Sequence, residues 1–416
     1  MSQQELQRIK VIENVVEGRI KVGEAAELLS LSRRQVQRLR QSYRAGDVAW
    51  VRHGNRGKEP ANRIDTEVRQ KILELARGRY RGFNDTHLTA KLTQVEKVAV
   101  SRATVQRILR AAGLTSPQKR RSPKYRSRRE RREQEGVMLQ TDGSRHDWLE
   151  TRGPKLTLLG FIDDATSKVP VAQFQLEGED TAGYLRITRQ VVEQQGIPLS
   201  IYRDQHSTFQ RNDAHWSVAE QLAGSQALTQ LGRCWQELGI TSIAARSAQA
   251  KGRVERLWRT FQDRLTSELR LAGACTVAQA NAVLERFLAE YNQQFAKPAP
   301  QAGVAYRKLD ARLDLDYIFA LRYERVVNPD HTIVVGAGLR VQLPALANHA
   351  GYAGKTVEVG QQPNGDIQVY LNRRLLHEEA AEPGSAPVRA RDMRRTSGPF
   401  RKKPVKTYAY AGRMAL

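Results

Sequence analysis

Three short apolar runs decide the fold: VMLQTD at residues 137–142, KLTLLGFIDD at 155–164 and KVPVAQFQLEG at 168–178. The periodicity of the chain changes at Val137, where these runs begin. Each run is close to the roughly 4 to 8 residues of a buried or half-buried strand. The runs therefore predict three consecutive β-strands in the middle of the chain.

The pattern after these runs predicts a sheet with helices on it. Residues 180–195 have the apolar spacing of a helix, and two further strand-like runs follow, PLSIYRD at 198–204 and GITSIAA at 239–245. Three successive strands followed by alternation of strands and helices predict a mixed α/β sheet flanked by helices. Ligands of such sheets tend to bind beyond the ends of the strands.

Three acidic residues occupy such places in the pattern. Asp142 follows the first run near the expected end of its strand, Asp204 ends the IYRD run, and Glu255 lies on the helix expected after the fifth strand. The residues are 62 and 51 positions apart, so only a fold can bring them together. Each also has an ordinary interpretation. Aspartate at a strand end is commonly a turn residue, and Glu255 is spaced to form a surface ion pair with Lys251.

The charge of the chain indicates a polyanionic partner. The 416 residues include 68 Lys and Arg against 44 Asp and Glu, a formal charge of +24. So large an imbalance repels itself in a compact protein and favours nucleic acid as the partner. Two basic segments, residues 119–135 and 389–413, carry fourteen of the surplus charges. Their dense like charge is typical of arms or solvated spacers, and not of core elements.

Membrane and secretory classes are disfavoured. No apolar run approaches the roughly 20 residues of a membrane-spanning helix, and the first residues, MSQQELQRIK, lack the apolar stretch of a signal peptide. The two cysteines, Cys234 and Cys275, have neither metal-binding spacing nor a disulfide framework. We therefore expect a reducing, cytoplasmic location.

The first third of the chain contains an internal repeat. LSRRQVQRLR at residues 31–40 and VSRATVQRIL at 100–109 share an apolar residue, Ser-Arg, and Val-Gln-Arg at the same spacing. Each copy follows two short amphipathic segments, and Ser32 with Gln35 has the spacing of a capping box. Three short helices, the last rich in Arg and Gln, are typical of a helix-turn-helix. We expect two such DNA-binding domains, at residues 1–50 and 62–114.

Candidate DNA-contacting residues follow from the repeat, because Arg and Gln side chains present paired hydrogen-bond donors to base edges and phosphates. Three-helix units with surface arginines also occur without DNA, but two copies in so basic a chain favour DNA binding. A basic linker is expected at residues 115–136. The candidates in the two units and the linker are Arg33, Arg34, Gln37, Arg38, Arg102, Thr104, Gln106, Arg107, Lys119, Arg120, Arg121, Arg128 and Arg129.

Four motifs resemble one known family. They are QTDGSRHDWLE (140–150), GFIDDATSKV (160–169), IYRDQHSTF (201–209) and AQAKGRVERLWRTFQDRL (248–265). Together they resemble bacterial insertion-sequence transposases with a retroviral-integrase catalytic core, and most resemble the ISNCY-like group. The resemblance spans residues 140–292 and implies an RNase H-like core, which we place at residues 137–296. One departure is the 50 residues between Asp204 and Glu255, a longer separation than many relatives have, which indicates a helical insert near residues 212–231.

The resemblance also implies a function. Asp142, Asp204 and Glu255 match the family's catalytic and metal-binding acids, with two Mg²⁺ ions, or Mn²⁺ in their place, held for phosphodiester chemistry. The implied reaction is cleavage at the 3′ ends of the element and strand transfer into target DNA, which is DNA integration and recombination by a synaptic homodimer or larger homo-oligomer. Basic residues beside Glu255 are expected to contact DNA phosphates: Lys251, Arg253, Arg256 and Arg259.

Several assignments remain open at this stage. The acids Asp147, Asp163 and Asp164 are interpreted as turn or structural residues, and His146 and His206 as polar filling or substrate contacts. Alternating runs at residues 310–380 predict a small β-barrel domain, and residues 384–416 a basic tail. A catalytically silent DNA-binding regulator derived from such an enzyme, or a structure-selective nuclease of the same fold, would share most of these features.

Overall fold

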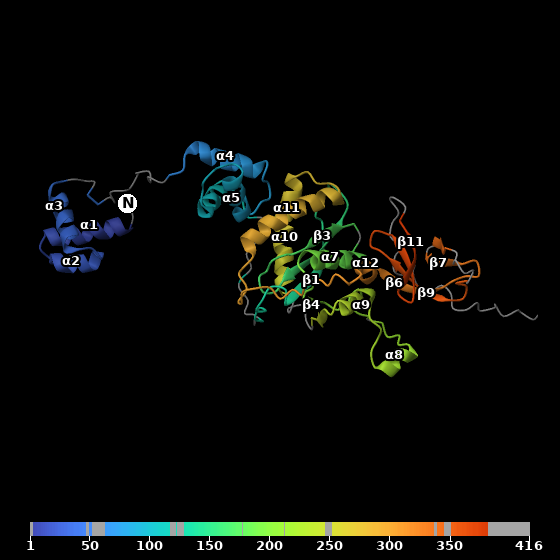
Figure 1. The fold of residues 1–416 in the computed structure, drawn as a ribbon. Helices are drawn as coiled ribbons and strands as arrows, with labels where there is room; N and C mark the ends of the chain where they lie inside the picture. Colours follow the sequence, from blue (N-terminus) through green and yellow to red (C-terminus); the bar gives the residue numbers. More distant parts are fainter. Residues whose placement is uncertain are drawn as a thin grey trace, which may run out of the picture. The chain divides into compact units, whose positions relative to one another are not determined.

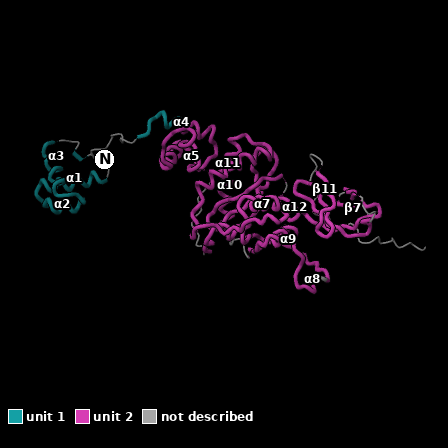
Figure 2. Tube along the Cα trace, in the orientation of Figure 1, with its two compact units in different colours: residues 1–71 teal, residues 72–416 magenta. Residues whose placement is uncertain are grey.

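The computed structural model describes residues 3–46, 50–51, 63–116, 122, 129–176, 178–211, 213–245, 252–336, 339–344 and 351–381. The chain divides into two compact units, residues 1–71 and 72–416 (Figure 2). Six of the expected features lie outside the described residues: Lys119, Arg120, Arg121, Arg128, Lys251 and the basic tail at 384–416.

The first unit contains a bundle of three helices, α1 (Gln3–Val16), α2 (Val22–Leu29) and α3 (Arg33–Arg44), shown in Figure 1. Ile12, Ala25 and Val36 are fully buried where the helices meet. The predicted capping box is confirmed. The backbone N–H of Gln35 donates to Ser32 Oγ over 3.3 Å, and the backbone N–H of Ser32 donates to Gln35 Oε1 over 2.9 Å.

The second copy of the repeat also forms three helices, α4 (Thr66–Arg77), α5 (Asp85–Gln94) and α6 (Arg102–Ala111). Ser101 caps α6 by accepting a hydrogen bond from the backbone N–H of Thr104 over 3.2 Å. Helices α5 and α6 belong to the same compact unit as the central sheet. Helix α5 is fastened to α10 (Gly252–Leu271) through polar contacts, of which His87 and Lys91 with Glu268 are the most buried.

The central domain is built on five strands, β1 (Met138–His146), β2 (Leu156–Asp163), β3 (Ala172–Gln175), β4 (Ser200–Arg203) and β5 (Thr241–Ala244), in the order β3-β2-β1-β4-β5. The first three strands pair antiparallel, and β4 and β5 join parallel to β1. This arrangement confirms the predicted mixed sheet. One detail of the prediction is wrong: Asp142 lies within a strand, because β1 stays paired with β2 as far as His146↔Leu156.

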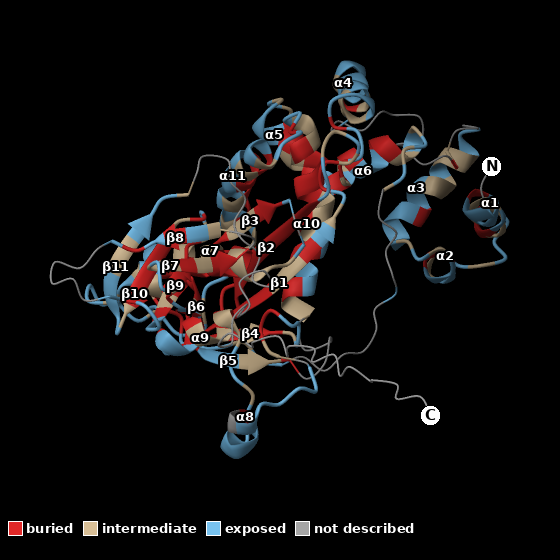
Figure 3. Ribbon diagram, turned by 90° about the vertical axis from the view of Figure 1, so that its right-hand side faces the viewer, coloured by how far each residue is buried: buried red, intermediate tan, exposed pale blue. Residues whose placement is uncertain are grey.

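Helices cover both faces of this sheet, and Figure 3 shows the buried residues running between the layers. Helices α7 (Thr181–Gln194) and α9 (Gln230–Glu237) share a core with Leu139, Phe161 and Ile201. On the other face, α10 and α11 (Val277–Phe295) share a core with Leu158 and Ile162. Strand β2 is buried on both faces because its alternate side chains enter the two cores.

A short helix, α8 (Val218–Ala223), lies in the predicted insert between β4 and α9 and stands away from the central domain (Figures 1 and 3). Its apolar side chains are turned to solvent, since Leu222 is 85% exposed and Val218 is 73% exposed. Within the part of the chain that is described, no helix is both long enough and apolar enough to cross a membrane.

The C-terminal region is mainly antiparallel β-structure after a short helix, α12 (Leu315–Phe319). Strands β6 (Leu321–Val326), β9 (Thr356–Gln361), β10 (Ile367–Leu371) and β11 (Arg374–Glu379) form a sheet in the order β11-β10-β9-β6. Strands β7 (Thr332–Gly336) and β8 (Leu339–Gln342) form a separate pair. Both sheets enclose one apolar core, but the pairings among the described residues do not close them into the expected barrel.

Candidate active site

Strand pairing brings Asp142 and Asp204 to the same level of the sheet. Strands β1 and β4 are parallel neighbours, with Met138 opposite Ser200 and Gln140 opposite Tyr202. Continuing this register by two residues places Asp142 opposite Asp204, which directly follows the last residue of β4. Two carboxylates that are 62 residues apart in sequence are therefore brought to one level of the sheet, where β4 ends and β1 continues.

Asp142 points toward the face of the sheet that α10 covers. Side chains alternate along a strand, so Gln140, Asp142 and Ser144 share one face. The Gln140 amide donates to Asp164 Oδ1 over 2.6 Å, and Gln262 of α10 donates to Ser144 Oγ over 3.1 Å. Because Ser144 meets α10, Asp142 lies on the α10 side of β1.

Glu255 lies in the first turn of α10, as predicted, and its side chain is exposed. Helix α10 runs along β1: Arg253 donates to Asp164, and the Trp258 ring lies against Gly160, which is paired with Asp142. Along α10, Glu255 therefore lies between Arg253 and Trp258, two residues that contact the part of the sheet around Asp142. Among the described residues, however, no group of three or more His, Cys, Asp or Glu side chains is close enough to hold a metal ion.

A further acid, Glu179, lies beside the two aspartates and was not identified from the sequence. The pKa of Glu179 is raised overall. Burial is the main cause, and the negative charges of Asp142 and Asp204 add to it, whereas the hydrogen bond from the Tyr184 hydroxyl acts to lower the pKa. The Tyr184 hydroxyl donates to Glu179 Oε2 over 2.8 Å. Its position in a loop gives Glu179 no periodic signal. The glycine at position 143, directly after Asp142, was the available clue.

His206 lies next to Asp204 in the loop that follows β4. Its backbone N–H donates to Asp204 Oδ1 over 2.8 Å, and its ring Nδ1 is 3.0 Å from the Thr208 hydroxyl oxygen. The side chain of His206 is exposed. These contacts shape the loop around Asp204 and leave a substrate role of His206 as a prediction.

The sequence of the chain is similar to those of known proteins. Residues 8–70 match the family model described as winged helix-turn helix. A protein named "Putative transposase y4bF" from Sinorhizobium fredii is 38% identical over 371 residues, which cover 89% of this chain and 79% of that protein. The protein named "Transposase for insertion sequence IS1202" from Streptococcus pneumoniae is 28% identical over 364 residues, 79% of this chain and 76% of that protein. The chain belongs to the family of bacterial insertion-sequence transposases.

Among solved structures, the catalytic core domain of BIV integrase matches 42% of this transposase-family chain and 90% of its own length. The sequence identity is 18% and the TM-score is 0.26. A similarity this low does not identify the fold of the transposase. The family assignment therefore rests on the sequence relatives alone.

The predicted structural role of Asp163 and Asp164 in the transposase is confirmed by their hydrogen bonds. Asp163 accepts from the backbone N–H groups of Gly136 and Thr166 over 2.9 and 2.7 Å. Asp164 is fully buried and accepts from Arg129, from Arg253 and from the backbone N–H of Arg132. Both aspartates hold the segment before β1 and the turn after β2.

The expected DNA-contacting residues of the transposase fall into two classes. Exposed side chains project from α3, α6 and α10: Arg33, Arg34, Gln37, Arg38, Arg102, Gln106, Arg107, Arg256 and Arg259. Thr104 is half-buried and accepts a hydrogen bond from Arg107 over 3.3 Å. Arg129 and Arg253 instead bind the buried carboxylate of Asp164. For these two arginines the contact within the protein is observed, and a contact with DNA stays a prediction.

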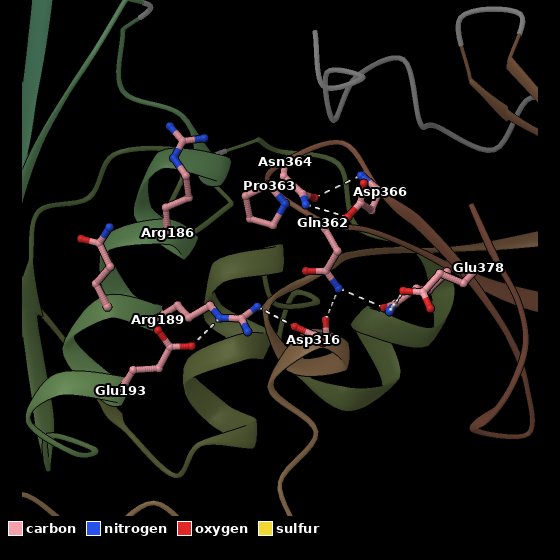
Figure 4. Close-up of a pocket in the computed structure, with 11 residues that line it drawn as sticks. Arg186, Arg189, Glu193, Asp316, Gln362, Pro363, Asn364, Asp366 and Glu378 are labelled. Carbon is pink, nitrogen blue, oxygen red and sulfur yellow. Dashed lines mark hydrogen bonds and ion pairs between the residues drawn. The ribbon is translucent and has the colours of Figure 1, made fainter. Parts of the chain in front are cut away.

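A cavity of about 440 Å³ lies away from these acids, between α7 and the C-terminal sheet (Figure 4). Arg189 crosses it, donating to Glu193 over 2.8 Å and to Asp316 over 2.7 Å. The Gln362 amide donates to the backbone carbonyl of Asp316 over 2.5 Å. These bonds fasten the C-terminal region to α7, so we interpret the cavity as a polar seam between two parts of the transposase.

Proposed function

We propose that the protein is a DNA transposase in which Asp142, Asp204 and Glu255 form an acidic catalytic centre. The reaction is metal-dependent cleavage at the 3′ ends of an insertion sequence, followed by strand transfer into target DNA. The observation that supports this proposal is the parallel pairing of β1 with β4 up to Gln140 opposite Tyr202, because continuing that register by two residues brings Asp142 level with Asp204. The first turn of α10, with Glu255, lies on the side of the sheet toward which Asp142 points.

The donor set suits Mg²⁺, or Mn²⁺ in its place, because these hard cations favour carboxylate oxygens and water. The carboxylates of Asp142 and Asp204 would hold a pair of ions, with Glu255 completing the set when DNA is bound. Bound ions would activate the attacking oxygen and stabilise the leaving oxygen of the phosphodiester. We infer that Arg256 and Arg259, exposed on α10 beside Glu255, bind DNA phosphates and so orient the strand at the acids.

The helical units supply DNA recognition in this proposal. The winged helix-turn-helix match at residues 8–70 includes α3, whose exposed Arg and Gln side chains would read the terminal inverted repeats. The second predicted helix-turn-helix, which contains α6, would bind the same ends. Cutting two ends together requires a homodimer or a larger assembly. Assignment to the ISNCY-like group rests on the sequence motifs alone.

The finer fold assignments belong to the same proposal. We infer an RNase H-like core at residues 137–296, supported by the mixed five-stranded sheet with helices on both faces. The C-terminal region would be a small open barrel, since Val335 and Val341 of the β7–β8 pair share one core with Val359 and Val369 of the four-stranded sheet.

Cleavage of DNA from the flanks of the protein's own gene tests the function. In Mg²⁺ the wild type is expected to nick the labelled ends, whereas Asp142→Asn, Asp204→Asn and Glu255→Gln each abolish nicking and leave end binding nearly unchanged. Asp310→Asn is the control, because Asp310 is exposed and bonded to its neighbour Arg312. Nicking by any of the three variants removes that acid from the centre.

The same assay separates the rival functions. A catalytically silent regulator would bind the end DNA and never nick it, with or without Mg²⁺. A structure-selective nuclease would cut branched DNA without any preference for the element's ends. Specific nicking of the ends by the wild type contradicts both.

A further inference from the structure

The carboxylate of Glu179 lies directly against the backbone of Gly143, the residue that follows Asp142. A methyl group placed on Gly143 would lie 2.5 Å from Glu179 Oε1, closer than two non-bonded atoms can approach. No left-handed backbone angle requires a glycine at this position. The three atoms nearest to such a methyl group all belong to Glu179, so this side chain fills the space directly above Gly143.

The loop before α7 holds Glu179 in this place. Asp180 caps α7 by accepting a hydrogen bond from the backbone N–H of Gly183 over 2.7 Å. The Gln175 amide donates to the carbonyl of Gly178 over 2.6 Å. The Tyr184 hydroxyl donates to Glu179 Oε2, and the Tyr184 ring is fully buried. Anchors on both sides of Glu179 and on its own carboxylate fix the direction of the side chain.

The anchored carboxylate faces like charges. The negative charges of Asp142 and Asp204 each raise the pKa of Glu179, and His206, next to Asp204, lowers it. The ring of Tyr184 packs against Phe209, in the loop after Asp204, with ring centroids 4.8 Å apart. Three carboxylates in one region of the sheet repel one another, and a divalent cation that drew them together would offset that repulsion.

We propose that Glu179 is a fourth carboxylate of the cation site, acting with Asp142 and Asp204, and that position 143 is glycine because a side chain there would expel it. This inference rests on the proposed function, since it assigns Glu179 to the same centre. Glu179 reaches the centre from the α7 side of the sheet, whereas Asp142 points to the α10 side. The cation would therefore be held beside β1, where β4 ends, between acids from both faces of the sheet.

Glu179→Gln is the decisive variant, because the amide keeps the length of the side chain and its carbonyl oxygen still accepts from Tyr184. Titration calorimetry of the full chain with MgCl₂ or MnCl₂ alone measures cation affinity without any DNA. We expect the dissociation constant to rise at least about tenfold, because one negative charge near a doubly charged ion is lost. In the nicking assay, the Mg²⁺ concentration for half-maximal rate should rise, and excess Mg²⁺ should restore part of the rate.

Gly143→Ala tests the same contact without changing any charge. Its Cβ would displace the Glu179 carboxylate, so the cation affinity should fall as in Glu179→Gln, and the two changes together should cost little more than either alone. Gly178→Ala is the matched control in the same loop, because nothing lies within 4 Å of a Cβ there. Glu193→Gln on α7 is the charge control, because Glu193 is bonded to Arg189 at the surface.

The outcomes separate this inference from the proposed function. Wild-type cation affinity in Glu179→Gln overturns the inference and leaves the function standing, provided that Asp142→Asn weakens binding. Unchanged affinity and nicking in Asp142→Asn overturn the function as well. A wild type that takes up no divalent cation without DNA overturns the inference, and its nicking activity in Mg²⁺ then decides the function. Should Gly143→Ala unfold, as judged by circular dichroism, Glu179→Gln decides alone.

Discussion

Arg253, in the first turn of α10, donates from Nη1 to Asp164 Oδ1 over 2.6 Å, across 89 residues of chain. Asp164 directly follows β2 and also accepts from the Gln140 amide of β1 over 2.6 Å. One buried carboxylate thus joins the start of α10 to two strands of the sheet. The position of Glu255, two residues beyond Arg253, depends on this bond.

Removing this carboxylate should destabilise the central domain. Asp164→Ala would leave the Arg253 side chain, which is 13% exposed, without its buried partner. Breaking one side of a buried ion pair typically costs about 3 to 5 kcal/mol. Urea denaturation followed by tryptophan fluorescence should show an earlier transition for the domain that contains Trp235 and Trp258. Asp310→Ala, at an exposed pair, should leave the transition nearly unchanged, and an equal shift in both variants would contradict the prediction.

The contact between α5 and α10 should weaken in acid. Burial lowers the pKa of His87. Burial acts to raise the pKa of Glu268, but hydrogen bonds from His87 and Lys91 outweigh it and hold that pKa below its ordinary value. Both groups bind more protons when the protein is unfolded, so the stability of the folded state falls as the pH falls. The contribution of His87 to stability is complete above its ordinary pKa of 6.5 and is lost as the pH falls toward its lowered pKa. The contribution of Glu268 to stability is lost in the same way below its ordinary pKa of 4.5.

The atoms around His87 explain this sign and provide the test. Its Nε2 is 2.6 Å from Glu268 Oε1, whereas its buried Nδ1 has no hydrogen-bond partner among the described residues, so a second proton there would be unsatisfied. In His87→Gln, melting temperatures measured from pH 7.5 to 5 should lose part of the acid dependence that the wild type shows. His215→Gln, at an exposed position, is the control, and identical pH profiles for wild type and His87→Gln would refute the assignment.

The exposed face of α3 should account for binding to the element's ends. Arg34→Ala and Arg38→Ala each remove an exposed guanidinium from this helix. Each should weaken end binding, and each should reduce the dependence of log affinity on log salt by about one ion if it contacts a phosphate. Arg19→Ala is the control, because Arg19 is bonded to Glu17 outside α3. Unchanged affinity in both α3 variants, measured by fluorescence anisotropy, would move DNA recognition to another surface.

The insert that carries α8 should be held by Glu220 and not by its apolar residues. Glu220 accepts from the backbone N–H of Ala227 over 2.7 Å, binds Arg211, and caps α8 with Ser217. The backbone N–H of Ala227 and the other donors lower the pKa of Glu220 to about 2. The contribution of Glu220 to the stability of the insert is therefore complete above pH 4.5 and is lost as the pH falls through about 2.

Limited proteolysis at neutral pH checks this account of the insert. Glu220→Ala should open the segment and speed its cleavage. Leu222→Ser should leave cleavage and melting unchanged, because Leu222 is 85% exposed and buries little area to lose. Faster cleavage of Leu222→Ser, or resistance of Glu220→Ala, would reverse the two roles.

Much of the local structure was predictable, because helices and strands have short periods that side chains reveal within one segment. The five runs between residues 137 and 245 became the strands of the central sheet, and Ser32 caps α3 as its spacing to Gln35 predicts. The order of the strands explains why the extent of β1 was misjudged. Pairing with β2 continues β1 past Asp142, and no signal within VMLQTD shows this.

The sequence by itself determined the kinds of element and the basic charge of the chain. Only the tertiary structure decided which distant segments come together: β1 beside β4, Arg253 against Asp164, and Glu179 against Gly143. The physical reason is that a repeating pattern acts over a few residues, whereas register and strand order are set by packing between segments far apart in the chain. A side chain at position 143 is excluded by Glu179, which takes its place above Gly143 only once α7 has docked on the sheet.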